Sequence, residues 1–249
     1  MTIVNSGLGA IFHMEILIRD LLFINYAVPP ERIRHLIPGS FDLETRNDKH
    51  GDARAFLSLV AFTVAEIRSN SLTAPGVSFN QINCRTYVDS QGTPAVYFLD
   101  LSVSSRMISA AASFLHLPVS YIPIELTVST PADGTTKRYS VESDRGRGLR
   151  ANVAIDGDGR PDGFDPAVSA EFITERPLGF IKSGTGDMYR IKVDHARLNA
   201  VATSDASIRS PSLESMGILL PAESAHPHSV LYAQESLFDA EAPGKIRVS

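Results

Sequence analysis

The sequence predicts one α+β domain, mostly β, built around a curved antiparallel sheet or barrel. Segments with period-two alternation or continuous apolar runs, bounded by Gly, Pro, Asn or Asp, recur along the chain and suggest about nine or ten strands. The pattern supports only three short helices. Because strands do not alternate with long helices, a doubly wound parallel sheet is disfavoured. No linker divides the 249 residues, so we expect a single domain over 1–249.

The first part of the chain predicts three strands and one helix. Residues 21–27 form an apolar run typical of a buried strand. Pro29 and Pro30 open a short helix, because the N–H that proline lacks would be unpaired in the first turn anyway. Pro38 ends it. Residues 41–45 form a strand, and the longer strand over 53–68 suggests a barrel wall.

A hairpin and a helix follow the loop over 71–78. The strands cover 79–88 and 95–103, joined by a turn over 89–92. Ser104 is expected to cap a helix over 105–115, which Leu117-Pro118 ends.

The remaining segments predict further strands with little helix. They are strands at 119–129, 136–143 and 149–155, a turn at 131–134, a helix from 165 to about 175, a strand at 189–195, a loop with one helical turn over 200–223 and a last strand at 229–233.

Composition excludes several classes of function. Hydrophobic residues make up 43% and charged residues 20%, as in soluble globular proteins. The net charge is −5, and the only basic cluster, over 145–150, is short. Neither nucleic acid nor a membrane surface is therefore an expected partner. A single cysteine, Cys84, and an N-terminal apolar stretch interrupted by charged residues predict a cytoplasmic protein without a signal peptide or membrane span.

The first hairpin strand carries an unusual polar face. Its alternation places Ile82, Cys84, Thr86 and Val88 on one side and Gln81, Asn83, Arg85 and Tyr87 on the other. Amides, a guanidinium and a phenol in a row are typical of a pocket for a small polar ligand, whereas solvated faces carry Lys, Glu and Ser. The alternative is an ordinary sheet face on which Arg85 pairs with a nearby carboxylate.

Common catalytic signatures are absent from the sequence. It contains no Gly-X-Ser-X-Gly motif and no phosphate-binding loop. Cys84 lies on the apolar face of its strand, where a structural thiol is commoner than a reactive one. Only His226 and His228 are close together among the histidines, without the other ligands of a metal site. We expect neither a metal nor a cofactor.

Several motifs together resemble the YqjF-like family, which is placed in the acetoacetate decarboxylase-like superfamily. They are residues 25–30 (NYAVPP), 36–38 (LIP), 83–88 (NCRTYV), 105–106 (SR), 114–118 (FLHLP) and 172–176 (FITER). The resemblance covers residues 22–176 most clearly. It implies a largely antiparallel barrel or stacked sheet enclosing a pocket, commonly in homo-oligomers.

The resemblance also implies a chemical difference. The best-known member of the superfamily decarboxylates a β-keto acid through a Schiff-base lysine, and residues 117–120 (LPVS) occupy the equivalent place without an amine. Residues 79–81 (FNQ) replace a Tyr-X-Glu, which removes a carboxylate, and Pro177 replaces an aromatic residue. Imine formation is therefore not expected at this position.

The remaining polar side chains suggest a reaction without an imine. Arginine suits a two-point clamp on a carboxylate, and amide or phenol donors can stabilise an enolate. We assign substrate binding to Arg85, Asn83, Gln81 and Arg106, and catalysis to Tyr87, His116 and Tyr121, with Glu125 as an alternative proton carrier. Against this, Arg85 can be a structural ion-pair partner and His116 a histidine that only satisfies a helix C-terminus.

These assignments predict a cofactor-independent lyase, hydratase, isomerase or cyclase acting on a keto or enol carboxylate. A non-catalytic protein that binds a small carboxylate in the same pocket is the main alternative. A structural component of an oligomer with a vestigial cavity is a third.

Overall fold

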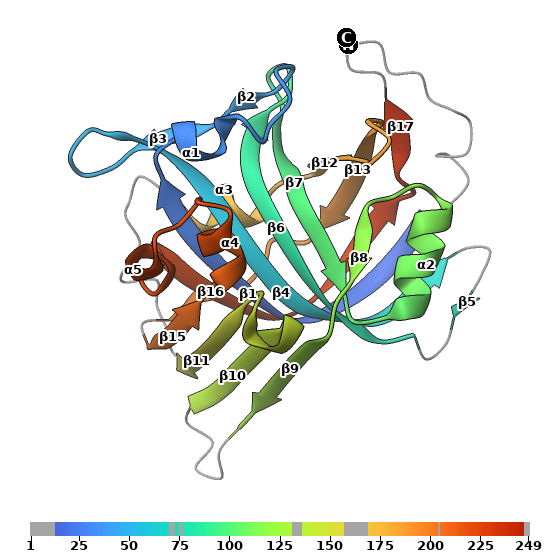
Figure 1. Ribbon diagram of the computed structural model, residues 1–249. Coiled ribbons are helices and arrows are strands. Elements are labelled where there is room, and N and C mark those ends of the chain that lie inside the picture. The colour runs from blue at the N-terminus through green and yellow to red at the C-terminus, as the bar shows by residue number, and fades with distance from the viewer. Residues whose placement is uncertain are drawn as a thin grey trace.

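The computed structural model describes residues 13–69, 73–74, 77–130, 136–156, 169–203 and 205–246 (Figure 1). The strands are β1 (His13–Val28), β2 (Asp42–Leu43), β3 (Thr45–Asn47), β4 (Ala53–Ser69), β5 (Thr73–Ala74), β6 (Phe79–Asp89), β7 (Pro94–Val103), β8 (Val119–Tyr121), β9 (Ile124–Ser129), β10 (Thr136–Ser143), β11 (Arg150–Asp156), β12 (Leu178–Lys182), β13 (Met188–His195), β14 (Val201–Ala202), β15 (Ala206–Arg209), β16 (Ser229–Glu241) and β17 (Gly244–Ile246). The α-helices are α1 (Glu31–Arg34), α2 (Arg106–Phe114), α3 (Ala170–Thr174), α4 (Pro211–Ser215) and α5 (Pro221–Ser224), and a 3₁₀ turn covers Asp144–Gly146.

Seven strands close into a barrel. They follow the order β16-β1-β4-β6-β7-β12-β13, and β13 pairs with β16 to complete the circle. β7 and β12 run parallel, whereas the other neighbours in the circle are antiparallel. Closure gives each of these strands a paired neighbour on both sides. The predicted mostly-β fold with a barrel is confirmed.

A second sheet covers part of the barrel's outer surface. It has four antiparallel strands in the order β15-β11-β10-β9 (Figure 1). Its residues Tyr139, Val141 and Val153 belong to the same buried cluster as Leu22 of β1 and Leu57 of β4. The barrel wall is therefore apolar on both faces here, which explains the unbroken apolar run over 21–24.

The predicted hairpin forms as expected. β6 pairs with β7 in antiparallel register, and the chain turns between Ser90 and Thr93, which exchange backbone hydrogen bonds. Ile82 and Cys84 pack outward in the cluster beneath the second sheet. The alternate residues of β6 therefore point toward the barrel interior.

Several local predictions were wrong in their boundaries. The strand expected over 119–129 divides into β8 and β9 around Pro123, because proline supplies no N–H to a sheet ladder. The cap of α2 is Ser105, whose Oγ accepts from Ile108 N at 3.4 Å, while the Oγ of Ser104 accepts from Asn80 N at 2.8 Å.

Other strands were missed or drawn too short. β12 was not predicted, and the loop expected over 200–223 contains β14, β15, α4 and α5. β1 and β16 each extend well beyond the predicted strands at 21–27 and 229–233. The predicted turn at 131–134 and the start of the helix predicted from 165 lie outside the described residues. Within the described residues, no helix is long and apolar enough to cross a membrane.

Candidate functional site

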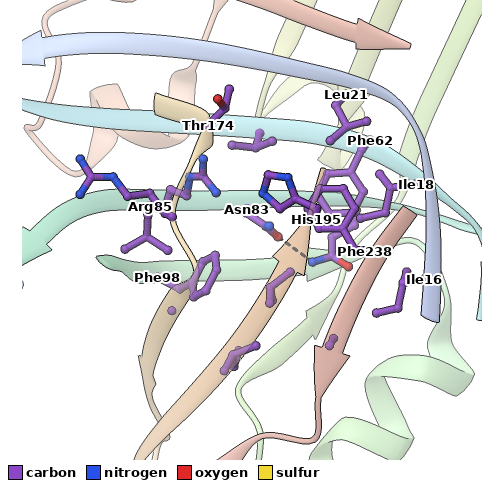
Figure 2. A pocket seen from close by; sticks show the side chains of 18 of the residues that line it. Ile16, Ile18, Leu21, Phe62, Asn83, Arg85, Phe98, Thr174, His195 and Phe238 are labelled. Carbon is purple, nitrogen blue, oxygen red and sulfur yellow. Dashed lines mark hydrogen bonds between the residues drawn. The ribbon is translucent and has the colours of Figure 1, made fainter. Parts of the chain in front are cut away.

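A cavity of about 200 Å³ lies inside the barrel and is lined by residues from all seven strands (Figure 2). Its walls are mainly aliphatic and aromatic, with Phe62 of β4, Phe98 of β7 and Phe238 of β16 among them. The polar residues that line it are Gln81, Asn83, Arg85, Thr174, Arg176 and His195. An apolar cavity with a few polar groups is the usual form of a small-molecule site.

Three of the four polar residues predicted on β6 line this cavity together. Gln81 Nε2 donates a hydrogen bond to Asn83 Oδ1 at 2.7 Å, which aligns the two amides along the strand (Figure 2). The Asn83 amide nitrogen has no protein acceptor among the described residues. It is therefore available to a ligand oxygen.

Arg85 is held in place without a counter-ion. Its Nη2 donates to the carbonyl oxygen of Ile173 at 2.8 Å, and its guanidinium carbon lies 5.5 Å from the centre of the Phe23 ring. Its Nε is buried without a hydrogen-bond partner, and no described carboxylate lies within ion-pair distance of it. A buried donor without a partner is costly. The alternative in which Arg85 pairs with a carboxylate does not hold for the described residues.

Arg176, the second arginine in the cavity wall, is bonded to the protein through each of its three guanidinium nitrogens. Its Nη1 and Nη2 donate to the two carboxylate oxygens of Glu44 at 2.8 and 3.1 Å. Its Nε donates to the carbonyl oxygen of Phe172 at 2.9 Å. The chain reaches this position directly after α3, which begins where Ser169 Oγ accepts from Phe172 N at 3.2 Å.

Tyr87 shares a strand face with Arg85 but lies behind the cavity. Its side chain is fully buried, and it is not among the lining residues. Its hydroxyl lies 2.6 Å from Ser58 Oγ and 3.4 Å from Ile173 O. Ser58 Oγ donates in turn to Asn25 Oδ1 at 2.6 Å. The structure thus places Tyr87 in a buried hydrogen-bond network that supports the cavity wall.

The other predicted site residues lie outside the barrel. Arg106, at the start of α2, stacks its guanidinium over the ring of Tyr121 at 4.6 Å. His116 follows α2 with a backbone φ of 59° and is exposed, as is Glu125. None of these four lines the cavity. The structure therefore does not bring them together with Arg85 and Asn83.

His195 is a lining residue that sequence reasoning did not select. It ends β13, where that strand pairs with β16, and its Nδ1 lies 2.9 Å from the carbonyl oxygen of Ala196. Its ring centre is 4.5 Å from that of Phe238. In the sequence, Ile191, Val193 and His195 share one strand face, so the histidine ending an apolar face was the available signal.

Cys84 has the environment of a structural thiol. It is buried on the outer face of β6, and this burial raises its pKa to about 12. A thiol that stays protonated is a poor nucleophile. Among the described residues, no three His, Cys, Asp or Glu side chains gather in an arrangement that could hold a metal ion.

Solved structures with a similar fold include acetoacetate decarboxylase from Legionella pneumophila (TM-score 0.61, 12% identity, 94% of this chain and 87% of that one). An acetoacetate decarboxylase-like enzyme from Sphingomonas wittichii RW1 gives a TM-score of 0.60 at 13% identity, over 96% of this chain and 94% of that one. The enduracididine biosynthesis enzyme MppR complexed with pyruvate also gives a TM-score of 0.60 at 13% identity, over 95% of this chain and 90% of that one. Similarity at these identities establishes an acetoacetate decarboxylase-like fold.

Sequence comparison identifies a nearer relationship. The uncharacterized protein YqjF of Bacillus subtilis (strain 168) is 33% identical over 105 residues, a match that spans 41% of each chain. Residues 16–236 match the DUF2071 family, described as an uncharacterized conserved protein. This match includes β4, β6, β7, β12 and β13 of the barrel in full and most of β1 and β16. The chain therefore belongs to the DUF2071 family and has an acetoacetate decarboxylase-like fold.

Proposed function

We propose that this protein is a small-molecule enzyme that acts on a keto or enol carboxylate without forming an imine. The observation that carries the proposal is Arg85, a guanidinium in the cavity wall that has a buried, unpartnered Nε and no described carboxylate partner. Guanidinium groups bind carboxylates through two parallel hydrogen bonds. A carboxylate ligand would supply the missing acceptor and the missing counter-charge together.

The amides on β6 extend the site along the strand. Residues two positions apart on one strand face are separated by about 7 Å. A ligand carboxylate at Arg85 would thus leave a neighbouring carbonyl or enolate oxygen within reach of the Asn83 amide, which Gln81 orients. Donors aimed at a developing enolate oxygen lower the barrier to its formation. The cavity of about 200 Å³ suits a small metabolite, since drug-sized ligands occupy pockets of about 300–1,000 Å³.

The lining residues favour a route without an imine. No lysine is among the described residues that line the cavity. An imine needs an unprotonated amine within reach of the ligand carbonyl. The reaction would then be that of a lyase, hydratase, isomerase or cyclase. The complex of MppR, a structural neighbour, with pyruvate supports a small keto carboxylate as the ligand class.

His195 is the proposed proton carrier. Histidine is the side chain that most often exchanges protons near neutral pH. If its Nδ1–H donates to Ala196 O, the Nε2 lone pair is left free to accept a proton from the ligand. This proposal takes the role first assigned to His116 and Tyr121, which do not line the cavity.

Calorimetric titration with pyruvate and 4-methyl-2-oxopentanoate tests the binding site. We expect Arg85→Gln to weaken binding by about tenfold or more and Arg85→Lys to retain part of it, because a buried charge-assisted contact contributes about 1.5–3 kcal/mol. Arg106→Gln, which removes an exposed guanidinium outside the cavity, is the matched control and should bind as the wild type does. Equal binding by Arg85→Gln and the wild type would refute the proposal.

Borohydride reduction in the presence of the keto acid tests the chemistry. We expect no covalent adduct in the mass spectrum of the protein, and an adduct would refute the imine-free route. A second candidate function is binding without catalysis, favoured by the mostly apolar walls and by His195 as the single described lining residue that can exchange protons near neutrality. Deuterium exchange at C3 of the bound keto acid separates the two: a catalyst accelerates it and His195→Gln abolishes the acceleration, whereas a binding protein leaves the exchange rate unchanged.

A further inference from the structure

We infer that the cavity selects keto carboxylates with a single negative charge and that Glu44 sets this selectivity. The inference rests on the proposed function and goes beyond it by assigning the substrate class and a specificity residue. Glu44 follows β2 and does not line the cavity itself. It acts through Arg176, which does.

The charges of the lining residues determine how many carboxylates the cavity can compensate. Two guanidinium groups line the cavity, Arg85 and Arg176, and no described lining residue is a carboxylate. The two oxygens of Glu44 accept from Arg176 at 2.8 and 3.1 Å. The Arg176 side chain is only 4% exposed, and the Glu44 side chain is 13% exposed. Because Arg176 is neutralised in this pair, Arg85 is the one uncompensated arginine in the described lining. The site therefore offers full charge compensation to one carboxylate.

Glu44 is held at a fixed position beside the cavity wall. Its backbone N–H donates to the carbonyl oxygen of Tyr87 at 3.0 Å, which ties it to β6 beside the cavity wall. Arg46 approaches the same carboxylate at 3.6 Å, but its side chain is 42% exposed and its charge is screened by solvent. All three nitrogens of Arg176 already have acceptors. Arg176 uses three of its five N–H groups in these bonds, and Glu44 already compensates its charge, so it offers a second ligand carboxylate no free counter-charge.

The apolar walls of the cavity disfavour a second carboxylate. Away from the polar strand, the cavity is bounded by side chains such as Ile16, Phe62 and Phe238 (Figure 2). A second carboxylate pressed against such walls would lose its hydration without gaining a partner, which disfavours its binding. A branched alkyl or aryl group would instead be stabilised there in proportion to the apolar surface that it removes from water. The favoured ligand is therefore a monocarboxylate with an apolar remainder.

Calorimetry with one monocarboxylate and one dicarboxylate tests the inference. The probes are 4-methyl-2-oxopentanoate and 2-oxoglutarate, titrated into the wild type, Glu44→Gln and the double variant Glu44→Gln/Arg176→Gln. We expect the wild type to bind the monocarboxylate about tenfold or more tightly than the dicarboxylate. Glu44→Gln should reduce this ratio by about tenfold, because it leaves the Arg176 charge free for a second carboxylate. The double variant removes both charges and should restore the wild-type ratio.

The outcomes separate this inference from the proposed function. Equal binding of the two probes by the wild type would overturn the selectivity, and this measurement does not depend on whether Glu44→Gln folds. An unchanged ratio in folded Glu44→Gln would overturn the role of Glu44. In both cases the proposed function stands if Arg85→Gln still weakens binding by about tenfold or more. Failure of the wild type to bind either probe would overturn both.

Discussion

Replacing Tyr87 by Phe distinguishes a buried structural phenol from a catalytic one. Ser58 has a single hydroxyl proton, which it donates to Asn25 Oδ1 at 2.6 Å. The 2.6 Å contact between the Ser58 and Tyr87 oxygens is therefore a bond in which Tyr87 donates. Asn25 continues the chain by donating to Ser229 Oγ at 3.1 Å. Removal of the phenol oxygen leaves Ser58 Oγ without its donor.

The size of the effect follows from burial. Tyr87 and Ser58 are both fully buried, so water cannot replace the lost donor. The ring keeps its place against Phe172, at 4.8 Å between centres, so the variant creates almost no cavity. A buried acceptor left unpaired costs about 1–3 kcal/mol. For a chain of this length, each kcal/mol lowers the melting temperature by about 2–4 °C, which predicts a decrease of about 2–12 °C.

Urea unfolding and thermal melts measure the stability, and calorimetry with 4-methyl-2-oxopentanoate measures binding. Tyr121→Phe is the matched control, because its ring is partly exposed outside the barrel and loses only a solvated hydroxyl. We expect Tyr87→Phe to be less stable and to bind ligand almost normally, and Tyr121→Phe to match the wild type in both. A Tyr87→Phe variant of normal stability that no longer accelerated deuterium exchange at C3 of the keto acid would refute this reasoning and restore Tyr87 as a catalytic residue.

Three further results are expected. Gly179→Ala should weaken ligand binding and destabilise the fold by about 1–3 kcal/mol in urea unfolding, because the new Cβ would lie 2.5 Å from a ring carbon of Phe98 and force that ring to shift at the cavity wall; unchanged binding would contradict this. Cys84 should resist Ellman's reagent at pH 8 in the native protein and react on unfolding, because burial raises its pKa to about 12; rapid labelling of the native state would contradict the assigned burial. Burial also raises the pKa values of Tyr26 and Tyr232. Since the unfolded chain releases these protons at lower pH than the folded one, the free energy of unfolding should fall as pH rises from about 9 toward 12, and a constant value between pH 8 and pH 11 would contradict the shifts.

Local periodicity in the sequence determined the hairpin and the orientation of its side chains. Successive residues of a strand point to opposite faces, so the amides and the guanidinium of β6 had to share one face once the strand was recognised. Cys84 on the other face was placed correctly for the same reason. The mostly-β fold followed from the same pattern repeated along the chain. Proline and serine signals located α2 only to within a residue and missed the division at Pro123, because neighbouring contacts decide which of two adjacent residues ends an element.

The tertiary structure alone decided which polar residues meet in the cavity. Barrel closure through the pairing of β13 with β16 brings His195 to the site of Arg85, more than a hundred residues away, and no local pattern encodes that pairing. The same closure leaves α2 and His116 outside, although they follow the hairpin directly in sequence. Whether a guanidinium is free or neutralised also depends on distant partners, so only the folded chain distinguishes Arg85, which lacks a described carboxylate partner, from Arg176, which Glu44 neutralises. Strand geometry acts between adjacent residues, whereas charge compensation and enclosure arise only when distant segments pack together.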